Sequence, residues 1–245
     1  MKFSIILFLI SISLSSFSQK SYWTAAGSYI FSSSNASYSD PNNSGERINV
    51  SGPVRFTLWL NTNMFYNYDF NSKVGIQTGF GVNNIGFITD EKSSVTLVSD
   101  PDYNVNIKWK RRAYSLSVPL GLKIGDLDGF HLFIGGQYDW LFHYKEKEFL
   151  STGKRKFTEW MSNRVTNFLP SAVVGIAFKK GIQLRFNYYL DDFMNKDYSY
   201  LNTANQTIKP YQDMDSRIMT LSIISGNIFR DYANSETTTK QIAVL

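Results

Sequence analysis

The chain has 245 residues, no cysteine and a formal net charge of +5, since 25 Lys and Arg outnumber 20 Asp and Glu. The lack of cysteine excludes a disulfide framework, thiolate metal sites and a lipid-modified N-terminal cysteine. Aromatic residues make up 16% of the chain and charged residues only 18%, less than the usual quarter, as expected if much of the surface faces lipid.

The N-terminal segment has the form of a secretory signal peptide. Lys2 precedes an apolar stretch at residues 3–14, and a small-x-small cleavage site follows at residues 16–18. This stretch is too short and too rich in serine to anchor the protein in a membrane. We therefore expect residues 1–18 to be removed. An exported chain rarely meets nucleic acid, so anionic lipid is the expected counterpart of the positive charge.

Beyond the signal peptide, about eight segments alternate apolar and polar residues. Such alternation is typical of β-strands with two different faces, because successive strand side chains point to opposite sides. The clearest segment runs from Phe130 to Lys145. In chain order, the segments cover approximately residues 22–32, 55–68, 74–83, 113–124, 130–145, 168–178, 182–191 and 219–224.

The connections between these segments are alternately short and long. Short polar turns occupy residues 71–73, 125–129 and 179–181, and long segments occupy residues 33–52, 90–109, 146–164 and 192–215. In the third long segment, the spacing of Phe157, Trp160 and Met161 favours a short helix. Closed transmembrane β-barrels combine short periplasmic turns with long extracellular loops, which is the pattern seen here.

The sequence therefore predicts an all-β protein, an eight-stranded antiparallel up-and-down transmembrane β-barrel. The barrel is expected over residues 19–229, followed by a polar periplasmic tail over residues 230–245. A soluble sandwich or lipocalin-like barrel would show the same alternation with the faces exchanged. The long strands, the aromatic residues at strand ends, and the Gly, Asn, Gln, Arg and Asp of the polar face favour the membrane barrel. Its expected location is the cell outer membrane.

The polar face of the predicted strands would line the lumen. An eight-stranded barrel has an interior just filled by side chains, and buried charges need partners. We interpret the charged and histidine residues of this face as a packed polar network, and we predict no catalytic, cofactor-binding or metal-binding residues. The network comprises Arg55, Asp69, Lys123, His131, Asp139, His143, Arg185 and Asp191.

Two alternatives to this interpretation involve the same lumen. The first is a lipid A-modifying hydrolase, in which Ser115, Asp139 and His143 would supply a nucleophile, a base and an orienting group. The second is a small passive channel. The neighbouring carboxylates of Asp191 and Asp192 do not indicate a metal site, because adjacent strand residues point to opposite faces.

Basic residues gather where the second and third long segments meet their strands. We expect them on the extracellular side, near the phosphates of lipopolysaccharide, which Arg binds through two parallel hydrogen bonds. The predicted lipopolysaccharide-binding residues are Lys108, Lys110, Arg111, Arg112, Lys154, Arg155 and Lys156. Alternatively, these charges are merely solvated and are partly neutralised by Glu146, Glu148 and Glu159.

Four runs of the mature chain carry a resemblance to a known family: FTLWLNTNMFYNYDF, VGIQTGFGVNNIGF, RRAYSLSVPLGLKIG and LRFNYYLDDF. Together with the signal peptide ending in Ser-Gln, they are similar to the small outer-membrane β-barrel family that includes PorT-like proteins. Some members of that family are linked to protein secretion or assembly at the outer membrane. Such barrels usually end on an aromatic residue, here Phe229, and the tail that follows departs from this pattern.

The resemblance brings no catalytic motif. We therefore expect a structural or interaction protein of the cell envelope that has no cofactor and is not an enzyme, in a role that supports secretion or assembly. Its expected partners are outer-membrane lipid and lipopolysaccharide, with another envelope protein as a further candidate and no nucleic acid.

Overall fold

The computed structural model describes residues 20–39, 46–94, 104–150, 153–178 and 181–228. The predicted signal peptide, Phe229 and the predicted C-terminal tail lie outside the described residues.

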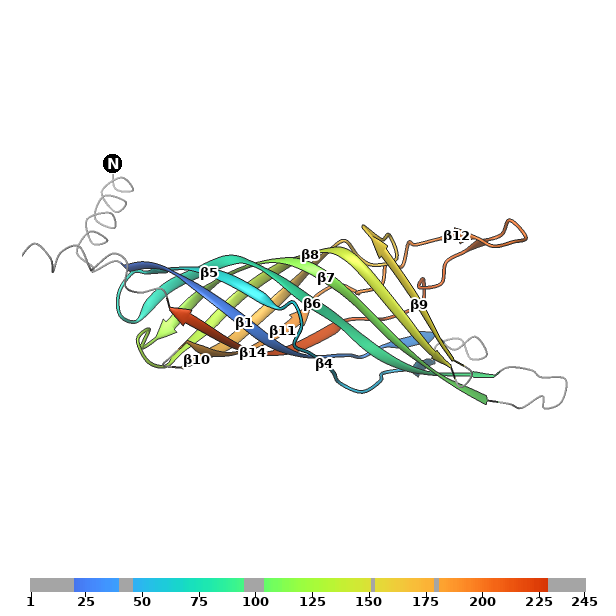
Figure 1. Cartoon of the computed structure of the whole chain (residues 1–245), viewed down its shortest axis with the longest axis horizontal. Coiled ribbons are helices and arrows are strands. Elements are labelled where there is room, and N and C mark those ends of the chain that lie inside the picture. The colour runs from blue at the N-terminus through green and yellow to red at the C-terminus, as the bar shows by residue number, and fades with distance from the viewer. Residues whose placement is uncertain (1–19, 40–45, 95–103, 151–152, 179–180, 229–245) are drawn as a thin grey trace, which may run out of the picture.

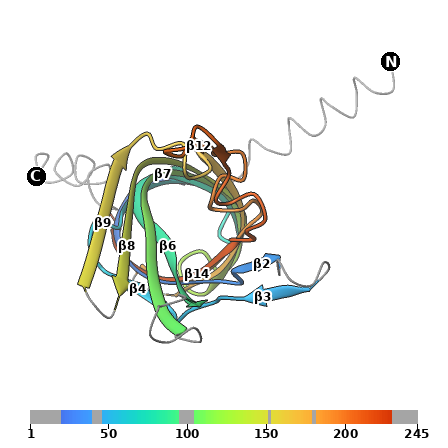
Figure 2. The ribbon, with the colours of Figure 1, turned by 90° about the vertical axis from the view of Figure 1, so that its right-hand side faces the viewer.

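Eight antiparallel strands pair side by side and close into a ring, which confirms the predicted fold class (Figures 1 and 2). Each strand pairs with the next around the ring, and the last strand, β14, pairs with β1 from Thr24↔Ile228 to Ser34↔Ile218. The strands in ring order are β1 (Lys20–Ser34), β5 (Thr62–Asp69), β6 (Val74–Ser94), β7 (Asn104–Gly125), β8 (His131–Leu150), β10 (Phe168–Phe178), β11 (Ile182–Tyr189) and β14 (Ile218–Ile228).

Smaller elements lie at the end of the ring that carries the long connections, here called the loop end. β4 (Arg55–Thr57) pairs with β1, and β9 (Gly153–Trp160) pairs with the last part of β8. Two hairpins join β2 (Ser37–Ser39) to β3 (Arg47–Asn49), and β12 (Tyr200–Leu201) to β13 (Thr207–Ile208). Among the described residues, no helix is long and apolar enough to cross a membrane.

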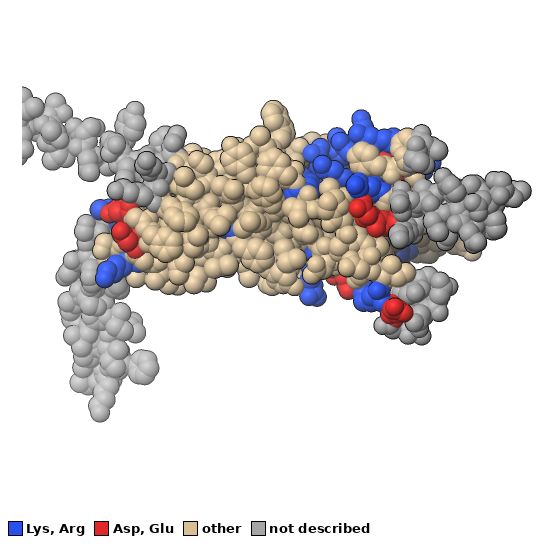
Figure 3. All heavy atoms as spheres, turned by 90° about the horizontal axis from the view of Figure 1, so that it is seen from below, with Lys and Arg blue, Asp and Glu red and all other residues tan. Residues whose placement is uncertain are grey.

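The outer surface of the ring is apolar around its middle. Large hydrophobic side chains project from it on every strand of the wall; they include Tyr29, Met64, Phe80, Leu120, Ile134, Val174, Phe186 and Leu221, all of them exposed. In Figure 3 few charged residues are visible in this band around the middle of the barrel, and Lys and Arg gather most densely near the loop end, with a smaller group of charges at the opposite end. A soluble barrel would place these side chains inside, so the band is a lipid face. The protein is a β-barrel of the outer membrane, with the loop end extracellular.

The interior has two chemically different halves. Near the short turns it is polar, with buried Asn, Gln, Ser and charged side chains. Near the loop end it is an apolar core, in which Phe87 and Tyr144 pack against Phe193 of the last long connection. We call this core the apolar cap; its other members include Val50, Ile85, Leu141, Val165, Leu169, Met194, Met214 and Ile218.

A β-bulge at Phe142 divides β8 into two parts with opposite facing. Tyr114 of β7 pairs with His143, whereas the next residue, Ser115, pairs with Leu141, so Phe142 has no counterpart on β7. An extra residue in one strand reverses which positions face inward beyond it. Odd positions of β8 face the lumen before the bulge, and even positions face inward after it. The single alternation predicted for this strand is therefore wrong beyond the bulge.

The third long connection is a strand pair, and the helix predicted near residues 157–161 is wrong. β8 continues to Leu150 and turns back as β9, whose Trp160 pairs with His143. Likewise, β6 and β7 remain paired as far as Ser94↔Asn104, well into the predicted second loop. The sheet of β6, β7, β8 and β9 thus extends beyond the bilayer on the extracellular side, and we call this part the sheet extension.

Candidate functional site

The lumen near the turn end holds a continuous polar network. Lys123 forms an ion pair with Asp69, and its Nζ also donates hydrogen bonds to Tyr22 Oη and Asn67 Oδ1, both at 3.2 Å. Gln77 Nε2 donates to the same Asn67 oxygen at 2.8 Å. The two charged side chains are buried, so the ion pair depends on these neighbours instead of on water.

Arg185 extends this network without a carboxylate partner among the described residues. Its guanidinium donates to Gln77 Oε1 and to Gln183 Oε1, the latter at 2.8 Å from Nη2 and 3.1 Å from Nε. The rings of Phe65 and Phe133 lie against it, with centroids 4.6 and 4.1 Å from Cζ. Amide oxygens and aromatic faces therefore stabilise this buried charge.

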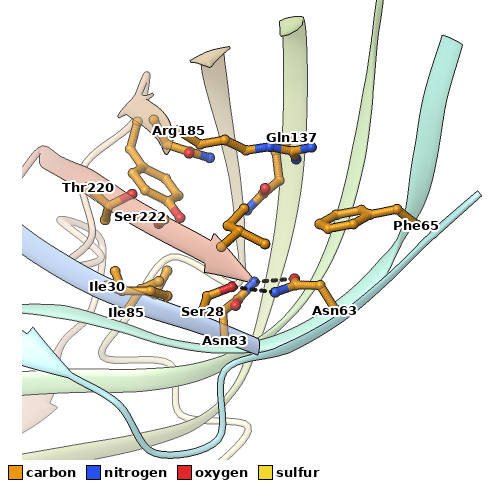
Figure 4. A pocket seen from close by; sticks show the side chains of 13 residues that line it. Ser28, Ile30, Asn63, Phe65, Asn83, Ile85, Gln137, Arg185, Thr220 and Ser222 are labelled. Carbon is orange, nitrogen blue, oxygen red and sulfur yellow. Dashed lines mark hydrogen bonds between the residues drawn. The ribbon is translucent and has the colours of Figure 1, made fainter. Parts of the chain in front are cut away.

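Little space remains in the middle of the lumen, beside Arg185. A cavity of about 30 Å³ lies beside Arg185, which is room for about two water molecules (Figure 4). Across it, Asn63 Nδ2 donates to Ser28 Oγ at 2.8 Å, and Asn83 Nδ2 donates to Asn63 Oδ1 at 3.4 Å. Side chains fill the barrel at this level, and the apolar cap lies above it, so the geometry does not favour the passive channel.

Asp139 is the acidic centre of the upper lumen. It is fully buried and accepts hydrogen bonds from Ser115 Oγ at 2.8 Å, Gln137 Nε2 at 2.7 Å and Tyr189 Oη at 3.2 Å, as well as from the Ser117 hydroxyl. The serine and the carboxylate proposed for a hydrolase do meet.

His143, the third member of that triple, lies on the opposite face of the wall. Because of the bulge, its ring projects outward, with its centroid 5.5 Å from that of Tyr114 and 4.5 Å from that of Trp160. Its Nε2 lies 3.0 Å from Thr158 Oγ1 of β9. The triple of Ser115, Asp139 and His143 is therefore not assembled, and its prediction for a hydrolase site is wrong.

Five of the other predicted lumen residues lie where the sequence places them, inside the wall or at its turn end. Asp69, Lys123, Asp139 and Arg185 lie buried inside the wall, and His131 is half-buried at the turn end.

One further lumen assignment needs correction besides that of His143. Asp191 is exposed beyond β11, because the strand ends at Tyr189. Arg55 is buried, as predicted, and its guanidinium donates to the backbone carbonyl and the side-chain oxygen of Asn84, at a seam described below.

Seven cations lie on the outward side of the sheet extension, and we call this surface the outer basic face. They are Lys108, Lys110 and Arg112 of β7, Lys145 and Lys147 of β8, and Lys154 and Lys156 of β9. Register sets them directly against one another, with the pairs Lys110↔Lys147, Arg112↔Lys145 and Lys147↔Lys156. The alternation that the bulge creates is what brings Lys145 and Lys147 to this side.

The like charges of this face, which lies above the membrane-spanning part of the wall, lower one another's pKa values. Burial lowers the pKa of Lys110, and the charges of Arg55 and Arg112 lower it further. Burial likewise lowers the pKa of Lys147, followed by the charges of Lys154 and Arg112. Lys108 has an acidic partner, Asp90, at 3.7 Å. Within the described part of the chain, no ion pair neutralises Lys110, Arg112, Lys145 or Lys147.

Two of the predicted lipopolysaccharide-binding residues face the other way. Arg111 points inward and is only 3% exposed, with Nη1 3.2 Å from Glu91 Oε1 and Nε 3.3 Å from Glu146 Oε2. Arg155 lies on the other side of β9 from Lys154 and Lys156, 3.8 Å from Glu148, with its side chain 78% exposed. Strand neighbours alternate between faces, so a run of basic residues cannot all lie on one side. The assignment of the buried Arg111 is therefore wrong.

An aromatic row marks the membrane interface directly below the outer basic face. Tyr114, His143 and Trp160 are opposite one another on β7, β8 and β9, and Phe142 and Trp140 lie beside them. Tyr and Trp are typical of the level of lipid headgroups. The outer basic face therefore begins at the height of the headgroup phosphates.

No protein-family model and no curated protein matches the chain. Among solved structures, the chain is similar to Ail, the attachment invasion locus protein of Yersinia pestis, in complex with the heparin analogue sucrose octasulfate. That match has a TM-score of 0.34 and 15% identity, and covers 84% of this chain and 99% of Ail. The outer membrane protein OprG from Pseudomonas aeruginosa matches with a TM-score of 0.33 and 11% identity, covering 85% of this chain and 95% of OprG.

Proposed function

We propose that the protein is a structural or interaction protein of the outer membrane, not an enzyme, that binds the phosphates of lipopolysaccharide through its outer basic face. The observation that carries this proposal is the register that sets Arg112 opposite Lys145 and Lys110 opposite Lys147. Like charges directly opposite each other destabilise a sheet. A polyanionic partner removes the repulsion, so the face is most stable when lipopolysaccharide covers it.

The height of the face supports the same partner. It begins immediately above the aromatic row, where the outer leaflet carries its phosphates. Basic residues near an anionic membrane surface contribute about 1 kcal/mol each, and less as salt increases. Binding through this face should therefore be multivalent and sensitive to ionic strength.

A triple charge change on β8 and β9 tests the proposal. Lys145→Gln, Lys147→Gln and Lys156→Gln together should reduce the lipopolysaccharide retained per folded protein on purification in mild detergent. The matched control removes three exposed cations elsewhere, at Lys20, Lys73 and Lys209. Faster migration of unboiled than of boiled protein shows that each barrel is folded. Equal lipopolysaccharide in both variants and the parent, at one ionic strength, contradicts the proposal.

The resemblance to PorT-like barrels supports the further proposal of a role in secretion or assembly with another envelope protein. The exposed Tyr200 and Leu201 of β12 provide apolar side chains on the extracellular side for such a contact. A photocrosslinker placed at residue 201 should capture one defined envelope protein in native membranes, whereas one placed at Lys73 should not. The same products from both positions, or none from residue 201, would exclude this surface.

A further inference from the structure

The barrel wall contains an interruption between β1 and β6. β5 pairs with β6 only up to Thr62↔Val82, and the chain before β5 leaves the wall at residues 58–60, returning at Asn61, whose carbonyl accepts the Ser28 N–H at 2.9 Å. Leu60 there has a positive φ of 56°, which is uncommon for a residue other than Gly. Trp59 at the tip is 74% exposed. The segment predicted as one strand over residues 55–68 is thus two strands, β4 and β5, with an apolar protrusion between them.

Side chains replace the backbone ladder at this interruption, which we call the seam. The backbone N–H of Asn84 on β6 donates to Asn61 Oδ1 at 2.8 Å. Arg55 Nη1 donates to the backbone carbonyl of Asn84 at 3.0 Å, and Nη2 donates to its side-chain oxygen. The seam is therefore held by polar side chains at the level of the aromatic row, since Asn84 pairs with Tyr114 of that row.

The seam contains more donors than acceptors. Arg55 is only 2% exposed, yet its Nε, Asn84 Nδ2 and the Nε of nearby Arg112 have no hydrogen-bond partner among the described residues. No described carboxylate forms an ion pair with either guanidinium, and the cation Lys110 lies close enough to feel both charges. A buried cation without a counter-charge is unfavourable. The seam therefore favours an anion over the exposed parts of Arg112 and Lys110.

A groove runs along the lipid face directly below the seam. It has a volume of about 610 Å³ and crosses the outward surfaces of β14, β1, β5 and β6. Ala25 and Gly27 form a floor of small residues, and the exposed side chains of Met64 and Phe80 form its apolar sides. Its upper end reaches Thr62 and Val82, the last paired residues before the seam.

We propose that the seam and the groove together bind one lipid A moiety, with a phosphate over Arg112 and Lys110 and an acyl chain along the groove. Three features select this occupant: an uncompensated positive charge, its position at headgroup height, and an apolar groove that continues from it into the bilayer. The buried charge of Arg55, in the seam next to Arg112 and Lys110, adds to the electrostatic attraction for the phosphate. The proposal deepens the proposed function, because it adds one defined lipid site to a surface that binds lipopolysaccharide more diffusely.

Filling the groove tests the site without touching any charge. A Cβ added at Gly27 would lie 3.9 Å from the nearest atom, the backbone oxygen of Asn61, so Gly27→Leu fits the wall and occupies the groove. Gly136→Leu is the matched control, because its Cβ would lie at an ordinary 3.4 Å from Ser171 O on another part of the lipid face. Arg55→Gln removes the buried charge.

Native mass spectrometry of the folded protein in detergent should show one tightly bound lipid A in the parent and in Gly136→Leu. Gly27→Leu and Arg55→Gln should each weaken this adduct about tenfold, which corresponds to about 1.4 kcal/mol. Phosphatidylglycerol and phosphatidylcholine serve as probes for a glycerophospholipid and for a neutral headgroup. Equal binding of either to the parent overturns lipid A as the occupant, and equal adducts in Gly27→Leu and Gly136→Leu overturn the site.

A single charge change on β9 separates this proposal from the proposed function. Lys145 and Lys147 pair directly with Arg112 and Lys110, whereas Lys156 lies on β9, two strands away from β7. Lys156→Gln alone should therefore reduce salt-sensitive lipopolysaccharide while the single lipid A adduct persists. Loss of salt-sensitive binding combined with no effect of Gly27→Leu would retain the proposed function and reject the site. The reverse result would retain the site and reject the proposed function.

Discussion

Arg112 of β7 and Lys145 of β8 stand directly opposite each other on neighbouring strands, and both project outward. The residues next to them, Arg111 and Glu146, are also opposite each other but face inward, where they form an ion pair of 3.3 Å. One sheet thus pairs opposite charges on one face and like charges on the other. Folding alone does not require like charges to face each other on the outer side, since uncharged polar residues could occupy the same strand positions.

Removing one charge from the outer face should stabilise the isolated barrel. We predict that Lys145→Gln raises the free energy of unfolding by about 0.2–1 kcal/mol in low salt without lipopolysaccharide, because it relieves the cross-strand repulsion with Arg112. Added salt should shrink the gain, and added lipopolysaccharide should reverse its sign. Urea unfolding followed by tryptophan fluorescence measures this, with Lys73→Gln as the control. A loss of stability in low salt would contradict the repulsion.

Removing one charge from the buried pair of Lys123 and Asp69 should instead destabilise the barrel. Lys123→Met leaves a buried carboxylate without its cation, so we expect the free energy of unfolding to fall by about 3–5 kcal/mol. The double change with Asp69→Asn leaves neither charge and should recover most of that loss. A double-mutant cycle from urea unfolding measures the coupling. Additive effects of the two single changes would show that the pair is not coupled.

Asp139 and His143 should respond differently, although they lie only four residues apart. Asp139→Ala leaves the buried donors of Ser115, Gln137 and Tyr189 without their acceptor and should destabilise the barrel, by about 1–3 kcal/mol per group left unpaired. His143→Ala removes an outward ring and should leave the lumen intact. Temperature-dependent migration of unboiled samples compares the two. Equal losses would place His143 back in the lumen.

Acid should loosen the contact between the first and last long connections. Asp215 bonds to Ser37 through the backbone, and its carboxylate pairs with Lys196 at 2.9 Å and Arg47 at 2.8 Å. The hydrogen bond from Lys196 is the main cause that lowers the pKa of Asp215, partly opposed by burial.

Since the folded pKa lies below the ordinary value of about 3.9, the stabilisation is complete above that pH and is lost as the pH falls through the folded pKa. The pair is partly exposed, so its contribution should stay below about 1 kcal/mol. Hydrogen exchange of the peptide around residue 215, corrected for intrinsic rates, should speed up below pH 4 in the parent. Asp215→Asn should show this faster exchange at neutral pH, and Asp213→Asn should not.

The ring of eight strands is predictable from the sequence because each strand meets lipid on one side. In β7, for example, Leu116, Val118, Leu120 and Leu122 must all face outward, which fixes the period and the register together. The short turns follow in the same way: Asn71 Oδ1 accepts the backbone N–H groups of Lys73 and Val74, a role that asparagine commonly has in tight turns.

The extracellular half is not predictable on the same basis. Both faces of the sheet extension are polar or mixed there, with Lys147 on one side and Glu146 on the other, so alternation no longer separates lipid from lumen. This is why the sequence of a paired strand in this region, such as β9, resembles that of a charged loop. The sequence does not reveal the bulge at Phe142 for a different reason. The extra residue is apolar and continues the alternation of apolar and polar positions. Only the pairing of β8 with β7 shows that the inward and outward positions have exchanged.

The apolar cap draws its residues from Ala36 near the start of the described chain and from Ile218 near its end. These residues can meet only on the extracellular side, after the segments that carry them have crossed the membrane. Until then they are unpacked apolar surface, and packing them brings the first and last strands together. Once the cap has packed, withdrawing a hairpin that contributes to it would also remove side chains from a core shared by β6, β7, β8, β10, β11 and β14. The cap should therefore oppose the withdrawal of those hairpins from the membrane.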